Sequence, residues 1–536
     1  MAIALYTAVE IVKANPQITI VGLCGLVSYL IVRYYNSPWR KLPPGPRGLP
    51  IIGNILQMHE KQWLQFTEWR KTYGDLIYLN AAGQPVIVIN SLKMASDLLD
   101  RRATNYSERP RNIVAGEIIT GGLFLTFQNH NDPIWRRMRR AGGEALNKGI
   151  APKYGYLQAT ESLILTAGLL ANPKTWDAQL RRTGASTTLT MVYGLAPTLN
   201  EHDPTVTAIG ESANVQTTAA IQGAHWVEFF PWMKYLPSSV APWKRRAEER
   251  FSLDSALFKK LFGDVRRRLG KGQQNESFAS TLIKDAERLG LSETENEWLS
   301  ANVFAAGADA VAAAGDWWIF AMCLYPETQR RAQAEIDSVV GRSRIPTLAD
   351  MDSLPYVRAM AKEVLRWRPV DPVGIPHCAA EDDWYEGYFI PKGTVMIPNV
   401  WLMNRDPEIH GPDAEHFNPA RHLDKDGKLT VVIPDTKEEN QLSYGFGRRV
   451  CLGRYVANNH IFLQIAIILW ALNIELPKDA NGKPIPLDVD DCRLHGLAVR
   501  PVPIQPKFTP RFPDVIETIE HELEARHIKV EEARAV

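Results

Sequence analysis

A glycine-rich segment around one cysteine constrains the fold of this chain more than any other part of the sequence. The run YGFGRRVCLG, residues 444–453, places three glycines and two arginines around Cys451. The glycines let the backbone turn tightly, and the residues from about Tyr455 predict a helix directly afterwards. A cysteine just before a helix N-terminus is biased toward the thiolate by the helix dipole and free N–H groups. The segment therefore predicts a functional thiolate, whereas an isolated cysteine is usually a small buried apolar residue.

Composition excludes several classes of protein. The 536 residues are 45% hydrophobic and 23% charged, which is ordinary for a packed globular protein and excludes a disordered chain, a collagen and a polytopic membrane protein. Lys and Arg number 61 against 60 Asp and Glu, so no basic excess predicts a nucleic-acid partner. The five cysteines form no CxxC pair, which argues against a disulfide scaffold and a zinc ribbon.

The N-terminal region predicts a membrane anchor. Residues Ile18 to Val32 carry no charge, and the aromatic and basic run RYYNSPWRK follows. This order is typical of a stop-transfer segment, so we expect a single transmembrane helix within 1–36 and the rest of the chain in the cytosol. A buried core helix is the alternative. The Pro- and Gly-rich residues 37–50 predict a stiff hinge.

The rest of the chain predicts one large domain, mainly α with small β-sheets (α+β). Residues 76–79 and 85–90 are expected as short strands, and 242–269, 296–324 and 326–340 as helices. No composition break interrupts the region, so we expect one catalytic domain over 51–512. Residues 513–536 are expected to form a C-terminal tail, either a solvated helix or a frayed end.

At this point the sequence resembles the cytochromes P450, from the anchor to about Pro510. The resemblance implies the P450 fold and makes residues 444–453 the loop that binds haem b, with Cys451 as the axial thiolate ligand of the iron. It assigns Arg449 to a haem propionate and Phe446 to the cofactor-binding residues. Tyr444 stands where the family usually has Phe, and its hydroxyl needs a partner.

Other family motifs lie at matching distances. Glu363 and Arg366 match the ExxR pair, and Arg421, in FNPAR, matches a downstream arginine. The resemblance implies that these three form a structural network. It also places Trp135 and Arg139 on a helix that contacts the haem propionates. His377 stands at a position that serves the same purpose in the family, and a structural histidine is an equal alternative.

The oxygen-activating helix departs from the family pattern. Residues 304–313 align with Ala/Gly-Gly-x-Asp/Glu-Thr-Thr, so Gly307 is expected to open the helix over the iron and Asp309 to supply the acid. The expected threonine is Ala310. Its hydroxyl helps to deliver protons in the family. Either water or a substrate hydroxyl replaces it, or the enzyme does something other than routine hydroxylation.

The resemblance therefore implies a haem-thiolate monooxygenase at the endoplasmic reticulum membrane, with a small apolar substrate. Electrons would come from NADPH–cytochrome P450 reductase, because the chain has no nucleotide-binding Gly-rich βαβ motif. The overall pattern is most similar to fungal secondary-metabolism enzymes, and a terpenoid is the preferred substrate class. A haem-binding scaffold without turnover, in a membrane-bound biosynthetic complex, is the alternative.

Two surface features bear on these partners. Arginines near the expected proximal side suit an acidic reductase: Arg136, Arg137, Arg140 and Arg448. The aromatic residues between Ile221 and Pro237 are either a core helix with its exit loop or, by resemblance, a cover of the substrate pocket that reaches the membrane. The stretch from Asn105 to Thr126, which includes Arg109 and Phe124, is expected to form another pocket wall together with Phe127.

Overall fold

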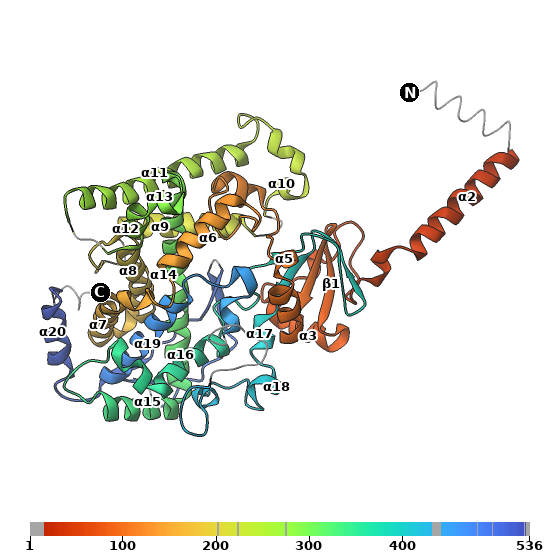
Figure 1. Ribbon diagram of the computed structural model, residues 1–536. Coiled ribbons are helices and arrows are strands. Elements are labelled where there is room, and N and C mark those ends of the chain that lie inside the picture. Colours follow the sequence, from red (N-terminus) through yellow and green to blue (C-terminus); the bar gives the residue numbers. More distant parts are fainter. Residues whose placement is uncertain are drawn as a thin grey trace.

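The computed structural model describes residues 16–200, 203–221, 224–273, 276–430, 441–479, 481–495, 497–529 and 531. It is rich in helices, with a smaller β region at one side (Figure 1). The helices are α2 (Pro16–Tyr35), α3 (Gln62–Tyr73), α4 (Leu92–Ala95), α5 (Ala103–Tyr106), α6 (Pro133–Ala145), α7 (Gly155–Ala171), α8 (Trp176–Tyr193), α9 (Pro204–Ala219), α10 (Trp226–Phe229), α11 (Pro242–Gly270), α12 (Phe278–Lys284), α13 (Ala286–Leu289), α14 (Glu293–Leu324), α15 (Pro326–Val339), α16 (Pro355–Trp367), α17 (Val400–Met403), α18 (Pro407–His410), α19 (Arg454–Ala471) and α20 (Val515–Ala525). The strands are β1 (Leu76–Ala81), β2 (Gln84–Ile89), β3 (His377–Cys378), β4 (Asp383–Tyr385), β5 (Tyr388–Ile390), β6 (Val395–Pro398), β7 (Leu472–Glu475), β8 (Cys492–His495), β9 (Ala498–Pro501) and β10 (Lys507–Pro510). The expected helix-rich α+β class is confirmed.

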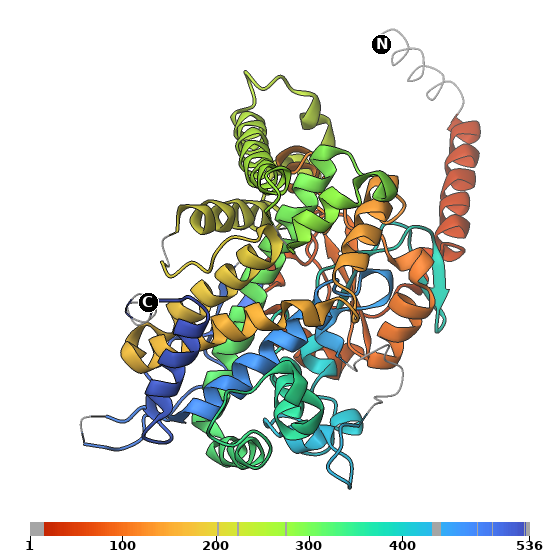
Figure 2. The same ribbon diagram turned by 60° about the vertical axis from the view of Figure 1, so that its left-hand side comes forward.

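Helix α14 runs through the middle of the helical part (Figures 1 and 2). Its N-terminus is closed by a capping box, in which Ser292 and Glu295 each accept a hydrogen bond from the other's backbone N–H. Trp298, Trp317 and Trp318 are buried along it. Because both ends of the helix are packed, the residues between them are held at a defined place.

The largest sheet has four strands in the order β1-β2-β6-β3. β1 and β2 form an antiparallel hairpin, as the sequence predicts, and the chain turns at Ala82 and Gly83 with φ of 50° and 92°. β2 and β6 are parallel, although they are far apart in the sequence. β3 pairs with β6 and is an edge strand of this sheet. It carries His377, whose side chain contacts the Tyr106 carbonyl oxygen.

The N-terminal helix α2 projects away from the body (Figure 1). No helix in the described part of the chain is long and apolar enough to cross a membrane. The single-pass anchor expected within 1–36 is therefore not supported, and residues 1–15 of it lie outside the described residues.

The C-terminal helix α20 is not the solvated helix expected for the tail. Val515, Ile519 and Leu523 are buried and belong to the main apolar core. Their spacing of four residues places them on one face of the helix, and that face is what the sequence interpretation overlooked.

Candidate functional site

The Cys451 loop is built on backbone contacts with a segment far earlier in the chain. Gly445 and Gly447 have φ of 78° and 56°, and a Cβ on Gly447 would collide with the Leu99 carbonyl oxygen. The Cys451 N–H donates to the Tyr444 carbonyl at 2.8 Å. Phe446 is buried in the apolar cluster that includes Leu99. The glycines are therefore required by the turn and by its close approach to residues 99–100.

The hydroxyl of Tyr444 has the partner that the sequence analysis asks for. It donates to Asn458 Oδ1 on α19 at 2.6 Å. This bond ties the loop to the helix that follows it.

In the protein alone, burial raises the pKa of the Cys451 thiol. Backbone N–H groups of Gly453 and Arg454 and the guanidiniums of Arg139 and Arg454 oppose the rise. The expected bias toward the thiolate is therefore wrong for the protein alone, because desolvation outweighs the helix N-terminus. Among the described residues, no three His, Cys, Asp or Glu side chains gather as a metal site.

Three arginines, one buried and two half-buried, lie close together beside this loop, and we call them the guanidinium cluster: Arg109, Arg139 and Arg449. Arg449 donates to the carbonyls of Ser107, Leu125 and Gln128. Arg139 donates to the Val450 carbonyl, and Arg109 to those of Thr126, Ile375 and Pro376. None of the three forms an ion pair with a carboxylate of the described residues.

The surroundings of the guanidinium cluster disfavour the charged form of its arginines and lower their pKa values. Burial lowers the pKa of Arg139 and of Arg449 to about 10; in Arg449 the charge of Glu108 opposes this fall and that of Arg139 adds to it. The pKa of Arg109 is lowered well below its usual value by burial and then by Arg449 and Arg139, against the opposing charge of Asp371. Buried cations are normally paired, so this cluster has spare capacity for an anion.

Trp135 and His377 border the guanidinium cluster. The Trp135 ring lies 4.5 Å from the Arg449 guanidinium carbon, and its buried Nε1 has no hydrogen-bond partner among the described residues. His377 Nδ1 lies 2.7 Å from the Tyr106 carbonyl oxygen, which accepts a hydrogen bond from the Nδ1–H group. Burial, with Arg109 and Arg449, lowers the pKa of His377 to about 3.

These residues fit a haem beside Cys451. A haem carries two propionate carboxylates, and the cluster offers positive charge together with a buried indole N–H that needs an acceptor. The structure thus brings together four of the expected cofactor residues, namely Cys451, Arg449, Trp135 and Arg139, and adds Arg109. His377 reaches the same cluster but enters it as a neutral side chain.

The middle of α14 is more open than its ends. Residues 298–302 and 311–323 are buried, whereas residues 305–310 are half-buried or exposed. Gly307 lies beside α8: a Cβ there would lie 3.1 Å from Thr188 Cγ2. A Cβ on Gly184 of α8 would likewise collide with the Ala308 carbonyl oxygen. The two glycines thus allow α8 and α14 to pack closely, and the role of Gly307 over the iron stays a prediction.

Asp309 forms an ion pair with Arg500 of β9. The Asp309 side chain is 37% exposed, while Arg500 is buried and also binds Asp316 at 2.6 Å. Ala310 follows with no hydroxyl. The acid of this helix is thus held by a residue that the sequence analysis did not identify.

Glu363, Arg366 and Arg421 form a buried network of ion pairs. Arg366 Nε and Nη2 donate to the two Glu363 oxygens, each at 2.8 Å, and Arg421 Nε donates to Oε1 at 3.0 Å. His422 Nε2 lies 2.9 Å from the other oxygen. Although burial alone would raise it, these partners hold the pKa of Glu363 far below its usual range.

The aromatic residues between Ile221 and Pro237 do not form a core helix. Trp226 and Tyr235 are 73% and 85% exposed, and Phe230 stacks on Trp226 at 6.5 Å. Phe124 and Phe127 stack on each other at 5.2 Å. The first group forms an exposed aromatic surface.

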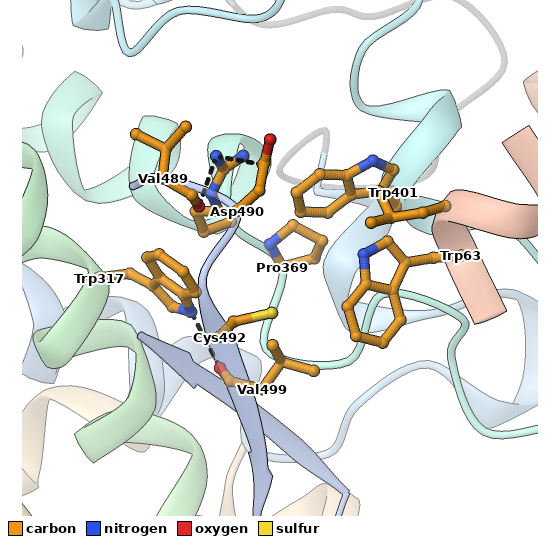
Figure 3. Close-up of a pocket in the computed structure, with 10 residues that line it drawn as sticks. Trp63, Trp317, Pro369, Trp401, Val489, Asp490, Cys492 and Val499 are labelled. Atoms are coloured by element: carbon orange, nitrogen blue, oxygen red, sulfur yellow. Dashed lines mark hydrogen bonds and ion pairs between the residues drawn. The ribbon is translucent and has the colours of Figure 1, made fainter. Parts of the chain in front are cut away.

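A small pocket elsewhere has no part in this site. It is lined by Trp63, Trp317, Trp401, Cys492 and Val499, among others (Figure 3). The Arg368 guanidinium packs against the rings of Trp317 and Trp401, at 5.4 and 4.7 Å. None of the lining residues belongs to the Cys451 loop or to the guanidinium cluster, and the stacking explains the pocket as core packing.

Sequence reasoning missed three of the residues in these networks. Arg109 was expected only in a pocket wall, and His422 and Arg500 were not expected at all. His422 follows Arg421 directly, so its position next to the FNPAR run could have indicated it. Arg500 reaches α14 from 191 residues away, and no local pattern indicates such a contact.

Comparison with known proteins gives consistent matches over most of the chain. A protein-family model described as cytochrome P450 matches residues 43–508. Cytochrome P450 monooxygenase ARMGADRAFT_1018420 of Armillaria gallica is 58% identical, over 93% of this chain and 95% of its own length. Cytochrome P450 monooxygenase 58 of Postia placenta is 46% identical, over 88% of this chain and 90% of its own. Cytochrome P450 monooxygenase iboC of Amanita muscaria is 41% identical, over 88% and 91%.

Proposed function

This chain belongs to the cytochrome P450 family, and from that premise we propose that it oxidises a small apolar secondary metabolite at a haem bound by Cys451. The protein is a P450 monooxygenase, an oxidoreductase whose cofactor is haem b with a cysteine thiolate as axial ligand. Members of the family generally bind small substrates and take electrons from a redox partner reductase.

The guanidinium cluster carries the assignment of the haem-binding residues. Arg109, Arg139 and Arg449 supply positive charge that is in ion-pair contact with no carboxylate of the described residues, although Asp371 and Glu108 lie near enough to act on Arg109 and Arg449. Trp135 supplies a buried N–H that has no hydrogen-bond partner among the described residues. Two propionates would satisfy these groups by charge-assisted hydrogen bonds. His377 would become a donor through Nε2 if the propionates raised its pKa.

When bound, the haem supplies the oxygen chemistry, and the thiolate ligand favours O–O cleavage. The protein's own part begins with Cys451. Arg139, Arg454 and the backbone N–H of Gly453 stabilise its negative charge. Phe446 is buried in an apolar cluster beside the loop, which is otherwise half-buried or exposed.

We propose that Asp309 would serve as the acid residue in proton delivery once the haem is bound. Its carboxylate is partly exposed at the open stretch of α14. Because Ala310 offers no hydroxyl, we propose that water completes the path from Asp309. A substrate hydroxyl in that place is the second arrangement that the departure allows.

We propose NADPH–cytochrome P450 reductase as the electron donor. Arg136, Arg140 and Arg448 are exposed, and none forms an ion pair with a carboxylate of the described residues. Such a surface attracts an acidic partner over about 8–10 Å at physiological salt. Added salt should therefore lower turnover more than it lowers substrate binding.

The substrate proposal is an apolar metabolite, with a terpenoid preferred. The alanines of α14 and the stacked Phe124 and Phe127 offer apolar surface, which favours such a molecule. The terpenoid preference rests on the resemblance to fungal secondary-metabolism enzymes.

We propose the endoplasmic reticulum membrane as the place of action, with the catalytic domain in the cytosol. Val27, Ile31 and Val32 stand exposed on the projecting helix α2, and Trp226 and Tyr235 are exposed on the body. Contact with lipid would cover this apolar surface. Fractionation of cells that express the chain with and without residues 1–36 tests the proposal, and a full-length protein that stays in the supernatant contradicts it.

Co-expression with a reductase and candidate apolar substrates, followed by product analysis, tests the activity. The reduced, CO-bound protein should absorb at about 450 nm, because a thiolate ligand would donate electron density to the iron that binds CO. Cys451→Ser should lose this band, while Cys323→Ser and Cys378→Ser keep it. A band that survives in Cys451→Ser contradicts the ligand assignment. Normal haem without any turnover would favour the scaffold alternative, for which Ala310 is the motivating observation.

A further inference from the structure

The short segment before α6 connects two exposed arginines. Arg448 Nη1 donates to His130 Nε2, and its Nη2 donates to Thr104 Oγ1 at 2.9 Å. Arg136 Nε donates to the His130 carbonyl oxygen at 3.3 Å, and its Nη2 donates to Asn131 Oδ1 at 3.0 Å. Both guanidiniums therefore contact the same two-residue segment, although the two arginines are far apart in the sequence.

A carboxylate beneath this segment holds it in place. Glu108 Oε1 accepts from Asn131 Nδ2 at 2.6 Å and lies 3.2 Å from His130 Nδ1, and Oε2 accepts from the His130 backbone N–H at 2.9 Å. The side chains of His130 and Glu108 are 3% and 12% exposed. Burial lowers the pKa of His130 although Glu108 opposes the fall, so the ring is neutral at pH 7. In that form Nδ1–H donates to Glu108 and Nε2 accepts from Arg448.

The two arginines keep capacity for an outside partner. Neither Arg136 nor Arg448 forms an ion pair with a carboxylate of the described residues, whereas Arg137 of the same helix pairs with Glu295 at 2.6 Å. Asp132 lies one turn before Arg136, but its side chain caps α6 by accepting from a backbone N–H. A guanidinium has five N–H groups, and two are used in each arginine. Both arginines thus retain donors for an acceptor on another molecule.

His130 also lies beside the proposed haem site. Its ring packs edge-on against Trp135, with 5.8 Å between the ring centroids. The Trp135 ring in turn lies 4.5 Å from the Arg449 guanidinium carbon, and Arg448 directly precedes Arg449. A protein bound by Arg136 and Arg448 would therefore sit next to the guanidinium cluster.

We propose that His130 and Asn131 are positioning residues for electron transfer, which hold Arg448 and Arg136 as a preformed pair that binds a carboxylate-bearing surface of the reductase. The proposal rests on the proposed function, in which a reductase supplies the electrons. A long exposed side chain loses conformational freedom when it docks, and a side chain that is already held loses less. Guanidiniums form bidentate bonds with carboxylates, so a fixed orientation adds specificity as well as affinity.

Binding of the reductase to the oxidised holoenzyme tests the proposal. His130→Phe keeps a ring against Trp135 and removes the acceptor of Arg448, so the dissociation constant for the reductase should rise about threefold to tenfold. His130→Gln retains an acceptor oxygen at the end of its side chain and should restore most of the affinity. Wild-type affinity in His130→Phe overturns the proposal.

Double variants identify the route of the effect. In an Arg448→Ala background, His130→Phe should weaken binding no further, because its effect passes through Arg448. Asn131→Ala in an Arg136→Ala background is the corresponding test for the second arginine. A further loss as large as in the wild-type background contradicts the positioning role.

Reduction under CO separates docking from damage to the haem site. With limiting reductase and NADPH, the CO-bound band should appear more slowly in His130→Phe by the same factor as the affinity falls, and saturating reductase should restore the wild-type rate. Dithionite is a small reductant that needs no docking surface, so it should reduce both proteins equally. A variant that is equally slow with both reductants contradicts the proposal.

His460→Phe is the matched control. His460 of α19 is another buried histidine, 3% exposed, and its Nε2 has no hydrogen-bond partner among the described residues. This variant should keep the affinity for the reductase, and equal losses in the two histidine variants would contradict a specific role of His130. A wild-type holoenzyme that dithionite reduces and the reductase does not would overturn the proposed electron donor as well, whereas wild-type behaviour of His130→Phe overturns only the positioning role.

Discussion

Two groups of arginines in this protein differ in whether a carboxylate of the described residues pairs with their charge. Around Glu363, the guanidiniums of Arg366 and Arg421 bind one carboxylate at 2.8 to 3.0 Å. In the guanidinium cluster of Arg109, Arg139 and Arg449, the hydrogen-bond acceptors are backbone carbonyls. The first group is complete within the protein. The second makes no ion pair with a carboxylate of the described residues, and we propose that the haem propionates complete it.

The largest effect should come from breaking the complete group. Glu363→Gln leaves the buried Arg366 without its carboxylate and takes one of two carboxylates from Arg421, which also binds Asp413 at 3.0 Å. Breaking such a buried pair costs about 3–5 kcal/mol. We expect a sharply reduced yield of haem-loaded protein and a lower thermal midpoint. Glu68→Gln, in the exposed pair with Lys71 at 2.8 Å, should cost about 1 kcal/mol or less. Equal effects of the two variants would remove the contrast.

Removing one arginine of the guanidinium cluster should affect the cofactor more than the fold. Arg449→Met relieves repulsion in the apoprotein and removes a charge-assisted bond to haem, worth about 1.5–3 kcal/mol. Haem affinity should fall about tenfold to a hundredfold, measured by transfer of haem to an apo-acceptor. Arg448→Met, beside it and exposed, should keep the affinity. A large loss of apoprotein stability with unchanged haem affinity would refute the cofactor role.

The pH dependence of stability should differ between apoprotein and holoprotein. Folding lowers the pKa of His377 from 6.5 to about 3. The unfolded chain then binds a proton that the folded apoprotein does not, so stability falls as the pH drops from 6.5 toward 3. At pH 5 the loss is about 2 kcal/mol. Urea unfolding should show it in the apoprotein, and less in His377→Gln or with haem bound, where propionates favour the charged ring. Identical curves for apoprotein and holoprotein would contradict contact between His377 and the propionates.

The smallest effect separates two tryptophans. Trp135→Phe removes a buried N–H that has no protein acceptor, so haem affinity should fall a few-fold, about 0.5–1.5 kcal/mol, with little change in apoprotein stability. Trp317→Phe removes an N–H that binds the Val499 carbonyl at 2.9 Å. That variant should lose stability and keep haem affinity. The opposite pattern would mean that the Trp135 N–H has no ligand.

Local patterns predicted the elements well, because hairpins, caps and helix periodicity depend on near neighbours. The strands beside Gly83, the long central helix and the helix after Cys451 follow from such patterns. The resemblance placed Trp135, Arg139 and Arg449, and the structure brings them to one cluster. Their roles toward haem stay predictions that the variants above test.

The sequence interpretation failed where the deciding contact comes from a distant part of the chain, or where two opposing free-energy contributions compete. The Cys451 thiol follows burial more than helix position. Arg500 enters from a strand near the end of the chain. In each case the sequence shows the residue type, while the partner depends on the complete fold.

The contact between Gly447 and residues 99–100 also governs when the ligand loop can form. The Gly447 N–H donates to Asp100 Oδ1, across a separation of 347 residues. Contacts of such sequence separation form late, because the chain between them must be ordered first. During synthesis, α6, α14 and two of the three clustered arginines emerge long before Cys451. With Cys451 as the proposed iron ligand, ligation would therefore be one of the last events of maturation. A nascent chain that stalls before residue 444 would lack that ligand, although most of the residues proposed to hold the haem would already have been made.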